Sequence, residues 1–448
     1  MFCYINDNVT QQSYISGESA VNIAGSVEAA VHAGRLKPGD SLPTVRELAV
    51  SLAVSPTTIA AAYKLLQSRG LVSGLGRKGT RITSRPPSPS VSARPRVPAG
   101  AVDLATGNPD PDLLPALDQA LRAVDPAPRL YDGPSMLPAL ATFAAGEFAA
   151  DGIPASSLTI TGGGLDAIER VLREHLRAGD RVAVEDPSFP GVPDLIAGNG
   201  FVPVPFAVDD EGPLPDSFAA AVSGRVRAAV ITPRAQNPTG AAITPARAAT
   251  LKKVLESVPG LLLVEDDHAG PVAGARAITV CDPGRERWAI VRSVSKFLGP
   301  DLRAAFVAGD SMTIARIEGR QALGTRWVSH VLQQLVLSLW CDPSSGRKLA
   351  RASEIYRQRR ETLRAALAAH GIDARGVSGL NVWVPVREEA ATVQGLLQKG
   401  WAVTPGERFR LHTPPAIRVT AAALKAPEAE RFAADLAAVV GARGASMA

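Results

Sequence analysis

Residues 261–268 read L-L-L-V-E-D-D-H, a short apolar run that ends in charged side chains. A continuous apolar run of this length, bounded by polar residues, is typical of a strand buried on both faces, as in a parallel sheet. The pattern recurs at 158–161, 181–184, 228–231, 289–291 and 304–307. Helical stretches separate these runs, so the sequence predicts an α/β fold with a mainly parallel sheet.

Polar clusters follow the predicted strands: G-G-G, E-D-P, T-P-R, E-D-D-H and R-S-V-S-K. In open α/β sheets, ligands bind beyond the carboxyl ends of the strands. We therefore expect a binding site where these clusters meet.

Lys296, in R-S-V-S-K-F-L-G-P at 292–300, has two interpretations. Taken alone, it is an ordinary lysine in a solvated loop. The other polar residues at the predicted strand ends favour a cofactor site, because Asp266 could accept a hydrogen bond from a protonated ring nitrogen and Arg303 could hold a phosphate. T-G-G-G at 161–164 precedes a predicted helix, whose N-terminal amides can cradle a phosphate. A lysine for an aldehyde, a carboxylate for a pyridinium and a phosphate cradle are what pyridoxal 5′-phosphate requires.

From about Val102 to Val440 the chain resembles the fold-type I aminotransferases, with the motifs in the family's order. The resemblance implies that Lys296 forms the internal aldimine, and that a small C-terminal α+β subdomain completes the body. It also assigns the other cofactor contacts: Asp266 to the pyridine nitrogen, Asn237 to the ring hydroxyl, Phe189 to the ring face, and Gly163, Gly164, Ser293 and Arg303 to the phosphate.

The same resemblance implies a homodimer and a carboxylate site. Tyr131, in R-L-Y-D-G-P, matches a tyrosine that reaches the phosphate of the neighbouring subunit, and Arg418, in A-I-R-V-T, matches the arginine that binds a substrate carboxylate. The chain departs from the family at His268, where a tyrosine usually donates to the ring oxygen. Imidazole can still donate there, but the pH response of the site should change.

The first eighty residues predict a different module. Thr44 and Glu47 have the T-x-x-E spacing of a capping box, and Ser55 can cap a second helix with Pro56 at its first position. Two helices joined by so short a turn, after an earlier helix at about 21–33, indicate helix-turn-helix. The segment L-V-S-G-L-G-R-K-G-T-R-I-T then predicts a two-stranded wing.

This segment, residues 17–83, resembles the GntR-type winged helix. By position, the resemblance assigns contacts with double-stranded operator DNA to Thr44, Arg46, Thr57, Thr58, Tyr63, Lys64, Arg77 and Lys78. Most of these would hold phosphates, and Arg46 is expected to read a base. The alternative for Tyr63 is a core position, and that for Arg77 and Lys78 is a solvated turn.

A linker rich in proline and serine, residues 84–101, divides the head from a body at 102–448. Residues 1–96 carry 11 basic and 5 acidic side chains, whereas the whole chain has a net charge of only +5. The basic character therefore belongs to the head, as expected for the module that meets DNA phosphates.

A GntR-type head on an aminotransferase-like body is similar to the MocR subfamily of bacterial transcription regulators. L-A-T-G-N-P-D-P-D-L-L-P and V-R-E-L-A resemble the branch that controls vitamin B6 salvage. The resemblance implies a DNA-binding regulator that responds to pyridoxal phosphate itself or to an amino compound. The alternatives are an active aminotransferase with an attached DNA-binding module, and a regulator whose body only dimerises.

The start M-F-C-Y-I-N-D-N-V lacks the basic stretch and apolar run of a signal peptide, and no membrane span is expected. Three widely spaced cysteines predict neither a disulfide framework nor a metal site. We therefore expect a cytoplasmic protein that is associated with the nucleoid when bound to DNA.

Overall fold

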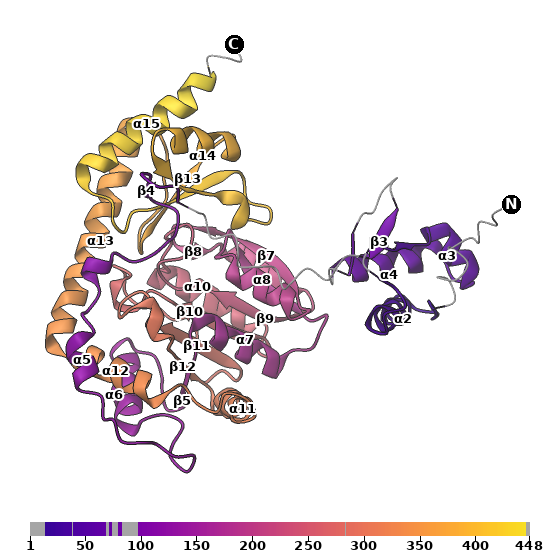
Figure 1. Cartoon of the computed structure of the whole chain (residues 1–448), viewed down its shortest axis with the longest axis horizontal. Helices are drawn as coiled ribbons and strands as arrows, with labels where there is room; N and C mark the ends of the chain where they lie inside the picture. Colours follow the sequence, from indigo (N-terminus) through magenta and orange to yellow (C-terminus); the bar gives the residue numbers. More distant parts are fainter. Residues whose placement is uncertain are drawn as a thin grey trace. The chain divides into compact units, whose positions relative to one another are not determined.

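The structure is a computed structural model of the chain, and it describes residues 14–37, 39–68, 71–73, 79–82, 97–282 and 284–444. The chain forms two compact units, Met1–Ser92 and Ala93–Ala448. Most of the predicted linker, residues 84–96, lies outside the described ranges. We call the first unit the head and the second unit the body (Figure 1).

The head begins with helix α2 (Ala20–His32), followed by α3 (Val45–Ser51) and α4 (Pro56–Ser68). The predicted capping box is present at α3: the Glu47 carboxylate accepts from Thr44 N at 2.8 Å, and Thr44 Oγ1 accepts from Glu47 N at 3.3 Å. Ser55 Oγ accepts from Thr58 N at 3.1 Å and so caps α4. Between the helices Ala53 adopts a left-handed conformation with φ 53°, which makes the tight turn.

A three-stranded antiparallel sheet completes the head, in the order β1 (Ser41–Leu42), β3 (Thr80–Ile82) and β2 (Val72–Ser73). The sequence predicted only two of these strands. A strand of two residues, such as β1, shows no periodicity, and so it was missed. The head has its own apolar core, with fully buried side chains from all three helices, including Ile23, Val27, Leu48, Ile59 and Leu66.

The body is built on an eight-stranded, mainly parallel sheet. Its strand order is β5 (Leu158–Thr161), β12 (Ala305–Gly309), β11 (Trp288–Ser293), β10 (Leu262–Asp267), β9 (Val226–Ile231), β6 (Arg181–Asp186), β7 (Val202–Asp209) and β8 (Gly212–Pro213). Strand β12 is antiparallel to both neighbours, and β8 is antiparallel to β7. All six predicted strands are present, and the fold class is confirmed.

Both faces of this sheet are buried. Alternate residues such as Val184, Val230 and Val264 pack in one core with α7 (Gly164–His175), α8 (Gly191–Gly198) and α11 (Ser311–Ala322). The intervening residues, such as Leu263 and Ile290, pack in a second core. The helices in that second core include α6 (Pro138–Ala150), α9 (Pro215–Ser223), α10 (Pro245–Glu256) and α12 (His330–Cys341). Burial on both faces explains why the strands read as continuous apolar runs.

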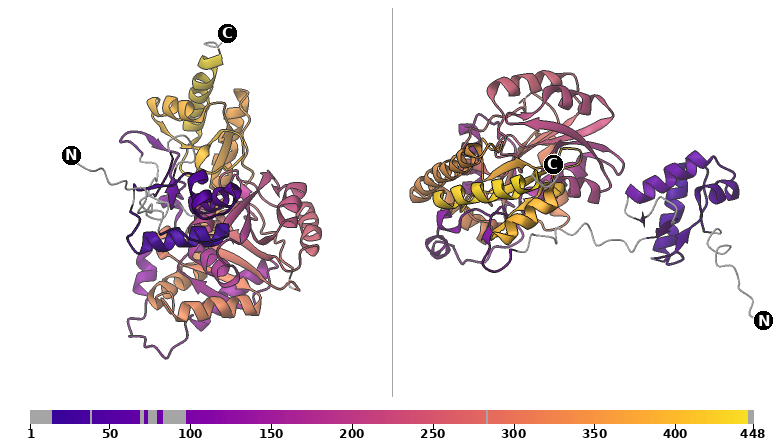
Figure 2. Two further views of the ribbon diagram at one scale, coloured as in Figure 1. Left: turned by 90° about the vertical axis from the view of Figure 1, so that its right-hand side faces the viewer. Right: turned by 90° about the horizontal axis from the view of Figure 1, so that it is seen from above.

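The C-terminal elements form a smaller α+β subdomain at one end of the body (Figures 1 and 2). Its sheet has the order β13 (Asn381–Pro385), β16 (Ala416–Thr420) and β15 (Thr404–Pro405). Its helices are α13 (Pro343–Ala369), α14 (Glu389–Gln398) and α15 (Ala426–Gly444). Strand β4 (Val102–Asp103) pairs with β14 (Trp401–Ala402), so the start of the body is joined to this subdomain.

Five shorter helical segments connect these elements: η1 (Pro111–Leu113), α5 (Asp118–Arg122), η2 (Gly270–Val272), η3 (Pro300–Leu302) and η4 (Gly406–Arg408). Across the described ranges, no single helix is long and apolar enough to span a membrane. Only α3 and α4 taken together, bent by 117° at the turn between them, reach that length and composition.

Candidate functional site

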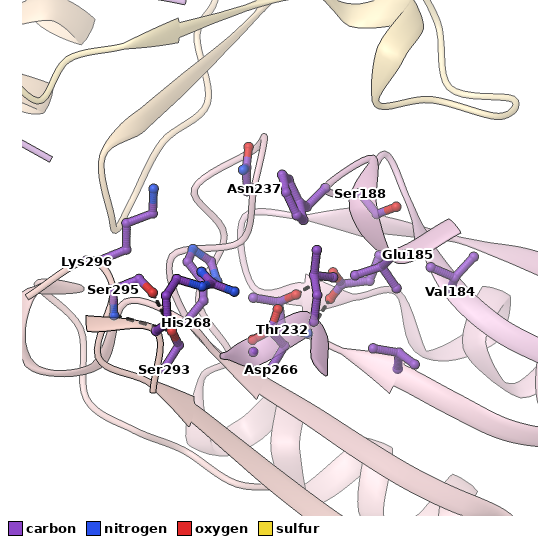
Figure 3. A pocket seen from close by; sticks show the side chains of 16 residues that line it. Val184, Glu185, Ser188, Thr232, Asn237, Asp266, His268, Ser293, Ser295 and Lys296 are labelled. Carbon is purple, nitrogen blue, oxygen red and sulfur yellow. Dashed lines mark hydrogen bonds between the residues drawn. The ribbon is translucent and has the colours of Figure 1, made fainter. Parts of the chain in front are cut away.

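The polar clusters at the strand ends meet in one cavity of about 210 Å³. The carboxyl ends of β6, β9, β10 and β11 contribute Glu185, Thr232, Asp266 and Ser293 to its lining (Figure 3). Because β12 is antiparallel, Arg303, just before its first residue, reaches the same edge. The site therefore lies where the parallel arrangement of the sheet predicted it.

Asp266 carries a buried carboxylate oxygen without a partner. Its Oδ1 atom has no hydrogen bond to any residue in the described part of the chain. Burial raises the pKa of Asp266 to about 7, and the neighbouring carboxylates of Asp267 and Glu185 add to the increase. A buried acceptor of this kind is costly unless a donor or a positive charge reaches it. The cavity thus has a place for a ligand that supplies a cationic N–H group.

Asp267, the next residue on β10, is held quite differently. Its two carboxylate oxygens accept from Arg234 Nε and Arg292 Nε, each at 2.8 Å. Burial alone would raise the pKa of Asp267, but the two guanidinium groups lower it well below its ordinary value. Successive side chains of a strand point to opposite faces, so one aspartate faces the cavity and the other a structural ion pair.

Lys296 follows β11, and its Nζ atom donates to the backbone oxygen of Gly107 at 2.6 Å. Burial lowers the pKa of Lys296 to about 8, with a further contribution from Arg418. A lysine with a lowered pKa has a larger fraction of neutral, nucleophilic amine near neutral pH. Burial, followed by the charge of Lys296, lowers the pKa of His268 to about 4, so this imidazole is neutral at pH 7.

An anion cradle lies at the start of α7. Gly163 has a φ of 125°, and a Cβ atom at this position would lie only 2.6 Å from Arg303 Nη2. Arg303 Nη2 also donates to Gly162 O at 3.0 Å. The guanidinium group, the N-terminus of α7 and the hydroxyl of Ser293 are therefore close together, with Gly164 lining the cavity beside them. Positive partial charge and free amides at a helix N-terminus favour a phosphate.

Asn237 and Phe189 also line the cavity, and 39% of Phe189 is exposed. Arg418, on β16, does not line it. Its guanidinium group donates to Ala105 O, to Asn237 Oδ1 at 3.3 Å and to Thr404 Oγ1 at 3.2 Å. Burial, followed by the charge of Arg408, lowers the pKa of Arg418 to about 10. The Nη1 and Nη2 atoms of the predicted carboxylate-binding arginine are thus engaged by the chain's own groups, whereas its buried Nε has no partner in the described part of the chain.

Tyr131 lies apart from the cavity and is 77% exposed. Its ring contacts Trp327 edge-on, with 5.6 Å between centroids, and the Arg326 guanidinium group lies 5.1 Å from its centroid. A contact between Tyr131 and the site of a second subunit stays a prediction, since a single chain is described.

Sequence reasoning missed several lining residues, among them Glu185, Ser188, Thr232 and Ser295. Glu185 is the most informative, because it lies in the E-D-P cluster after a predicted strand. It accepts from Thr232 N at 2.8 Å, from Thr232 Oγ1 at 2.9 Å and from Gln236 Nε2 at 3.1 Å. The strand-end rule pointed to this position, but nothing in the sequence showed which side chain of the cluster turns inward.

The predicted DNA contacts of the head are mostly accessible. Thr44, Arg46, Thr57 and Lys64 are exposed and Thr58 is partly exposed. For Tyr63 the structure corrects the DNA contact in favour of the alternative, a core position: its side chain is fully buried, and its hydroxyl donates to Pro43 O at 2.6 Å. Tyr63 therefore packs α4 against the loop before α3, instead of facing DNA. Arg77 and Lys78 lie outside the described residues.

Comparisons with known proteins match both units. The family model described as aminotransferase class I and II matches residues 100–436. The family model described as bacterial regulatory proteins, gntR family, matches residues 19–82. The first match covers well over half of the chain.

Two curated relatives align with this chain over most of their length. The vitamin B6 salvage pathway transcriptional repressor PtsJ of Salmonella typhimurium is 39% identical over 426 residues, covering 94% of this chain and 98% of that protein. The HTH-type transcriptional regulator TauR of Rhodobacter capsulatus is 26% identical over 389 residues, covering 77% of this chain and 79% of that protein.

Solved structures show the same body fold. LysN, the α-aminoadipate aminotransferase of Thermus thermophilus, solved with N-(5′-phosphopyridoxyl)-L-leucine, superposes with a TM-score of 0.69. The alignment covers 78% of this chain and 94% of LysN at 23% sequence identity. At this identity the likeness shows the fold and nothing more.

Proposed function

Since the chain belongs to the aminotransferase class I and II family and joins that body to a GntR-family head, as MocR-type DNA-binding transcription regulators do, we propose that it controls vitamin B6 salvage in response to pyridoxal 5′-phosphate. The similarity to PtsJ, 39% identical over nearly the whole chain, supports the assignment to this pathway. The signal would be the cofactor, and the output a change in operator affinity.

The unpartnered Oδ1 atom of Asp266 carries the proposal. A carboxylate whose pKa is raised to about 7 by burial gains most from a ligand with a protonated ring nitrogen, because that ligand supplies both the missing donor and the missing charge. A phosphate on the same ligand would meet Arg303 and the N-terminus of α7. The residues present therefore fit pyridoxal phosphate.

Each part of the cofactor has a proposed holder. We assign its phosphate to Gly163, Gly164, Ser293, Ser295 and Arg303, its ring face to Phe189, its ring hydroxyl to Asn237 and His268, and its aldehyde to Lys296. When bound, the cofactor supplies an aldehyde that condenses with amines and a ring that withdraws electrons. His268, neutral at pH 7, would offer one N–H donor without competing with Lys296 for a proton.

The state of Arg418 favours the cofactor over an amino acid as the effector. An amino acid bound at this site would place its carboxylate on Arg418, but that guanidinium group is buried and already donates to Ala105 O, Asn237 and Thr404. Apart from Gly163, which lies next to Arg303, the residues assigned to the cofactor line this cavity. A ligand that needs only this cavity shares Asn237 with Arg418 but can bind without displacing the contacts of Arg418 with Ala105 O and Thr404.

We further propose that the protein works as a homodimer in the cytoplasm, bound to a two-fold symmetric operator. A dimer would bring two heads to adjacent half-sites and would bury the exposed ring of Tyr131 near the second site. Size-exclusion chromatography with light scattering tests this: a monomer at micromolar concentration, with and without cofactor, would contradict it.

The cofactor is tested by reconstituting the purified chain with pyridoxal phosphate, reducing it with borohydride and mapping the modified peptide by mass spectrometry. We expect the phosphopyridoxyl group on Lys296, whereas modification spread over surface lysines would count against the site. Genome-wide mapping of bound DNA tests the pathway: binding sites beside genes of vitamin B6 uptake or phosphorylation are expected. Many turnovers with amino acid and keto acid pairs would instead favour an aminotransferase.

A further inference from the structure

The segment that opens the body crosses the site, and we call residues 102–110 the strap. At its start, β4 pairs with β14, and Leu104 N donates to Ala402 O at 2.9 Å. At its end, Asp110 Oδ2 accepts from Arg359 at 2.7 Å. The strap is therefore attached to the C-terminal elements at both ends.

The middle of the strap is shaped by one side chain. The Asp103 carboxylate accepts from Ala105 N at 2.9 Å, from Thr106 N at 3.0 Å and from Thr106 Oγ1 at 2.5 Å. Gly107 follows with a φ of 70°, and a Cβ atom there would lie 3.3 Å from Arg418 Nη1. The turn thus brings the backbone of the strap against the site, where a side chain at residue 107 would crowd the arginine.

Two backbone oxygens of the strap accept hydrogen bonds from Lys296, assigned to an aldehyde, and from Arg418, assigned to a carboxylate. Gly107 O accepts from Lys296 Nζ at 2.6 Å. Ala105 O accepts from Arg418 Nη2, and also from Thr404 Oγ1 at 2.8 Å. In Figure 3 the Lys296 side chain extends away from Asp266, the residue assigned to the ring nitrogen.

We propose that the strap is an internal competitor: Gly107 O holds Lys296 and Ala105 O holds Arg418 until a ligand takes their place. This inference rests on the proposed function and specifies how the same site is regulated. The ligand classes follow from the two groups. An aldehyde competes for Lys296, and a carboxylate competes for Arg418.

The chemistry at Lys296 explains why an aldehyde would release the strap. Condensation of the lysine amine with an aldehyde forms a C=N bond, and the aldehyde oxygen leaves as water together with two hydrogens of the amine. The nitrogen must also turn toward the cavity. Both changes weaken its hydrogen bond to Gly107 O, which a charged amine donor makes strong. A carboxylate at Arg418 would replace Ala105 O in the same way.

Release of the strap would affect the end of the body to which the linker and the head are attached. The strap follows directly after the predicted linker, residues 84–101, so it is the part of the body through which the head is tethered. A ligand changes operator affinity only if it binds the released and the held states with different affinities. For pyridoxal phosphate, which has an aldehyde and no carboxylate, the contact between Lys296 and Gly107 O provides that difference, because the held state keeps the lysine amine engaged.

The test uses two full-length variants that loosen the strap and leave every residue of the site in place, Asp103→Ala and Thr106→Val. Asp282→Ala is the matched control, because Asp282 also accepts from a nearby backbone N–H, that of Gly284 at 2.8 Å, but lies before the amino end of β11. Circular dichroism and thermal melts first establish that all three fold.

Pyridoxal phosphate should bind the strap variants about threefold to tenfold more tightly than the wild type, since tenfold corresponds to about 1.4 kcal/mol, the scale of one hydrogen bond. The ratio of operator Kd with and without pyridoxal phosphate should fall toward 1 in the same variants. Asp282→Ala should match the wild type in both measurements.

The outcomes separate this inference from the proposed function. If wild-type operator affinity does not change with pyridoxal phosphate, the proposed function fails. If it changes in the wild type and by the same ratio in Asp103→Ala and Thr106→Val, with unchanged cofactor affinity, the strap is not the competitor. Hydrogen exchange gives an independent readout: amides of 104–108 should exchange faster when pyridoxal phosphate binds, and slower exchange there would overturn the inference.

Discussion

The two neighbouring aspartates of β10 should respond in opposite ways to loss of their charge. In the cofactor-free protein, Asp266→Asn should stabilise the body at pH 8. Burial raises the pKa of Asp266 from 3.8 to about 7, and at 1.36 kcal/mol per pKa unit this difference sets a ceiling of about 4 kcal/mol. Some relaxation around the buried group is expected, so we predict a gain of about 1–4 kcal/mol.

The direction of the pKa shift determines how the stability gain of Asp266→Asn changes with pH. A group whose pKa is higher in the folded than in the unfolded protein favours folding at low pH, and this contribution is lost as the pH rises toward the folded pKa. The advantage of Asp266→Asn should therefore be small at pH 4, grow up to about pH 7 and stay constant above it. Asp267→Asn should instead destabilise the body by about 3–5 kcal/mol near neutral pH, because it leaves Arg234 and Arg292 without their buried partner.

Urea unfolding of the cofactor-free variants, followed by tryptophan fluorescence, measures both effects. The chain has five tryptophans and all lie in the body, at positions 288, 327, 340, 383 and 401, so the head does not contribute to the signal. Added pyridoxal phosphate should stabilise the wild type more than Asp266→Asn, whose neutral side chain loses the charge pair. Equal stability of Asp266→Asn and the wild type at pH 8, or equal protection by the cofactor, would refute the role assigned to Asp266.

Three further predictions concern the phosphate cradle, the head and its capping box. Gly163→Ala should weaken binding of pyridoxal phosphate at least about tenfold (about 1.4 kcal/mol), and binding of unphosphorylated pyridoxal far less, because the added Cβ atom would lie 2.6 Å from Arg303. The control is Gly179→Ala, also at positive φ but with no atom within 4 Å of the added Cβ. Equal losses for both ligands in Gly163→Ala would contradict the assignment of Gly163 to the phosphate. Arg46→Ala should weaken specific operator binding by about 1–3 kcal/mol in fluorescence anisotropy, whereas Lys78→Ala should mainly reduce the salt dependence; an equal loss for Arg46→Ala on random DNA would exclude base reading. Thr44→Ala should lower the stability of the isolated head by about 1 kcal/mol in thermal unfolding, and no change would show that the capping box contributes nothing.

The strands that the sequence predicted are those whose burial leaves a continuous apolar run. The six predicted runs all became strands of the central sheet, because both faces of each are covered. Strand β7 was missed since V-P-V-P-F, at 202–206, interrupts its apolar run with two prolines, which ordinarily mark edge strands or bulges. Its place next to the short edge strand β8 tolerates them.

The candidate site was predicted in outline by the order of polar clusters along the chain. What could not be predicted were contacts set by packing between distant segments. Nothing near Gly107 or Lys296 in the sequence indicates that their atoms lie 2.6 Å apart. The sequence also left Tyr63 between a DNA contact and a core position, and its hydrogen bond to Pro43 O, 20 residues away, decides for the core. These contacts depend on how elements pack together, which local patterns do not determine.

The most direct measurement of the central claim is the operator affinity of wild type and Lys296→Ala across a titration of pyridoxal phosphate, by fluorescence anisotropy with a DNA fragment from the genome-wide map. We expect the cofactor to change the wild-type Kd by about fivefold or more, the lower end of typical coupling between two sites. The Kd of Lys296→Ala should stay the same throughout the titration. An unchanged Kd in the wild type, or the same shift in both proteins, would contradict the claim that the protein senses pyridoxal phosphate through Lys296.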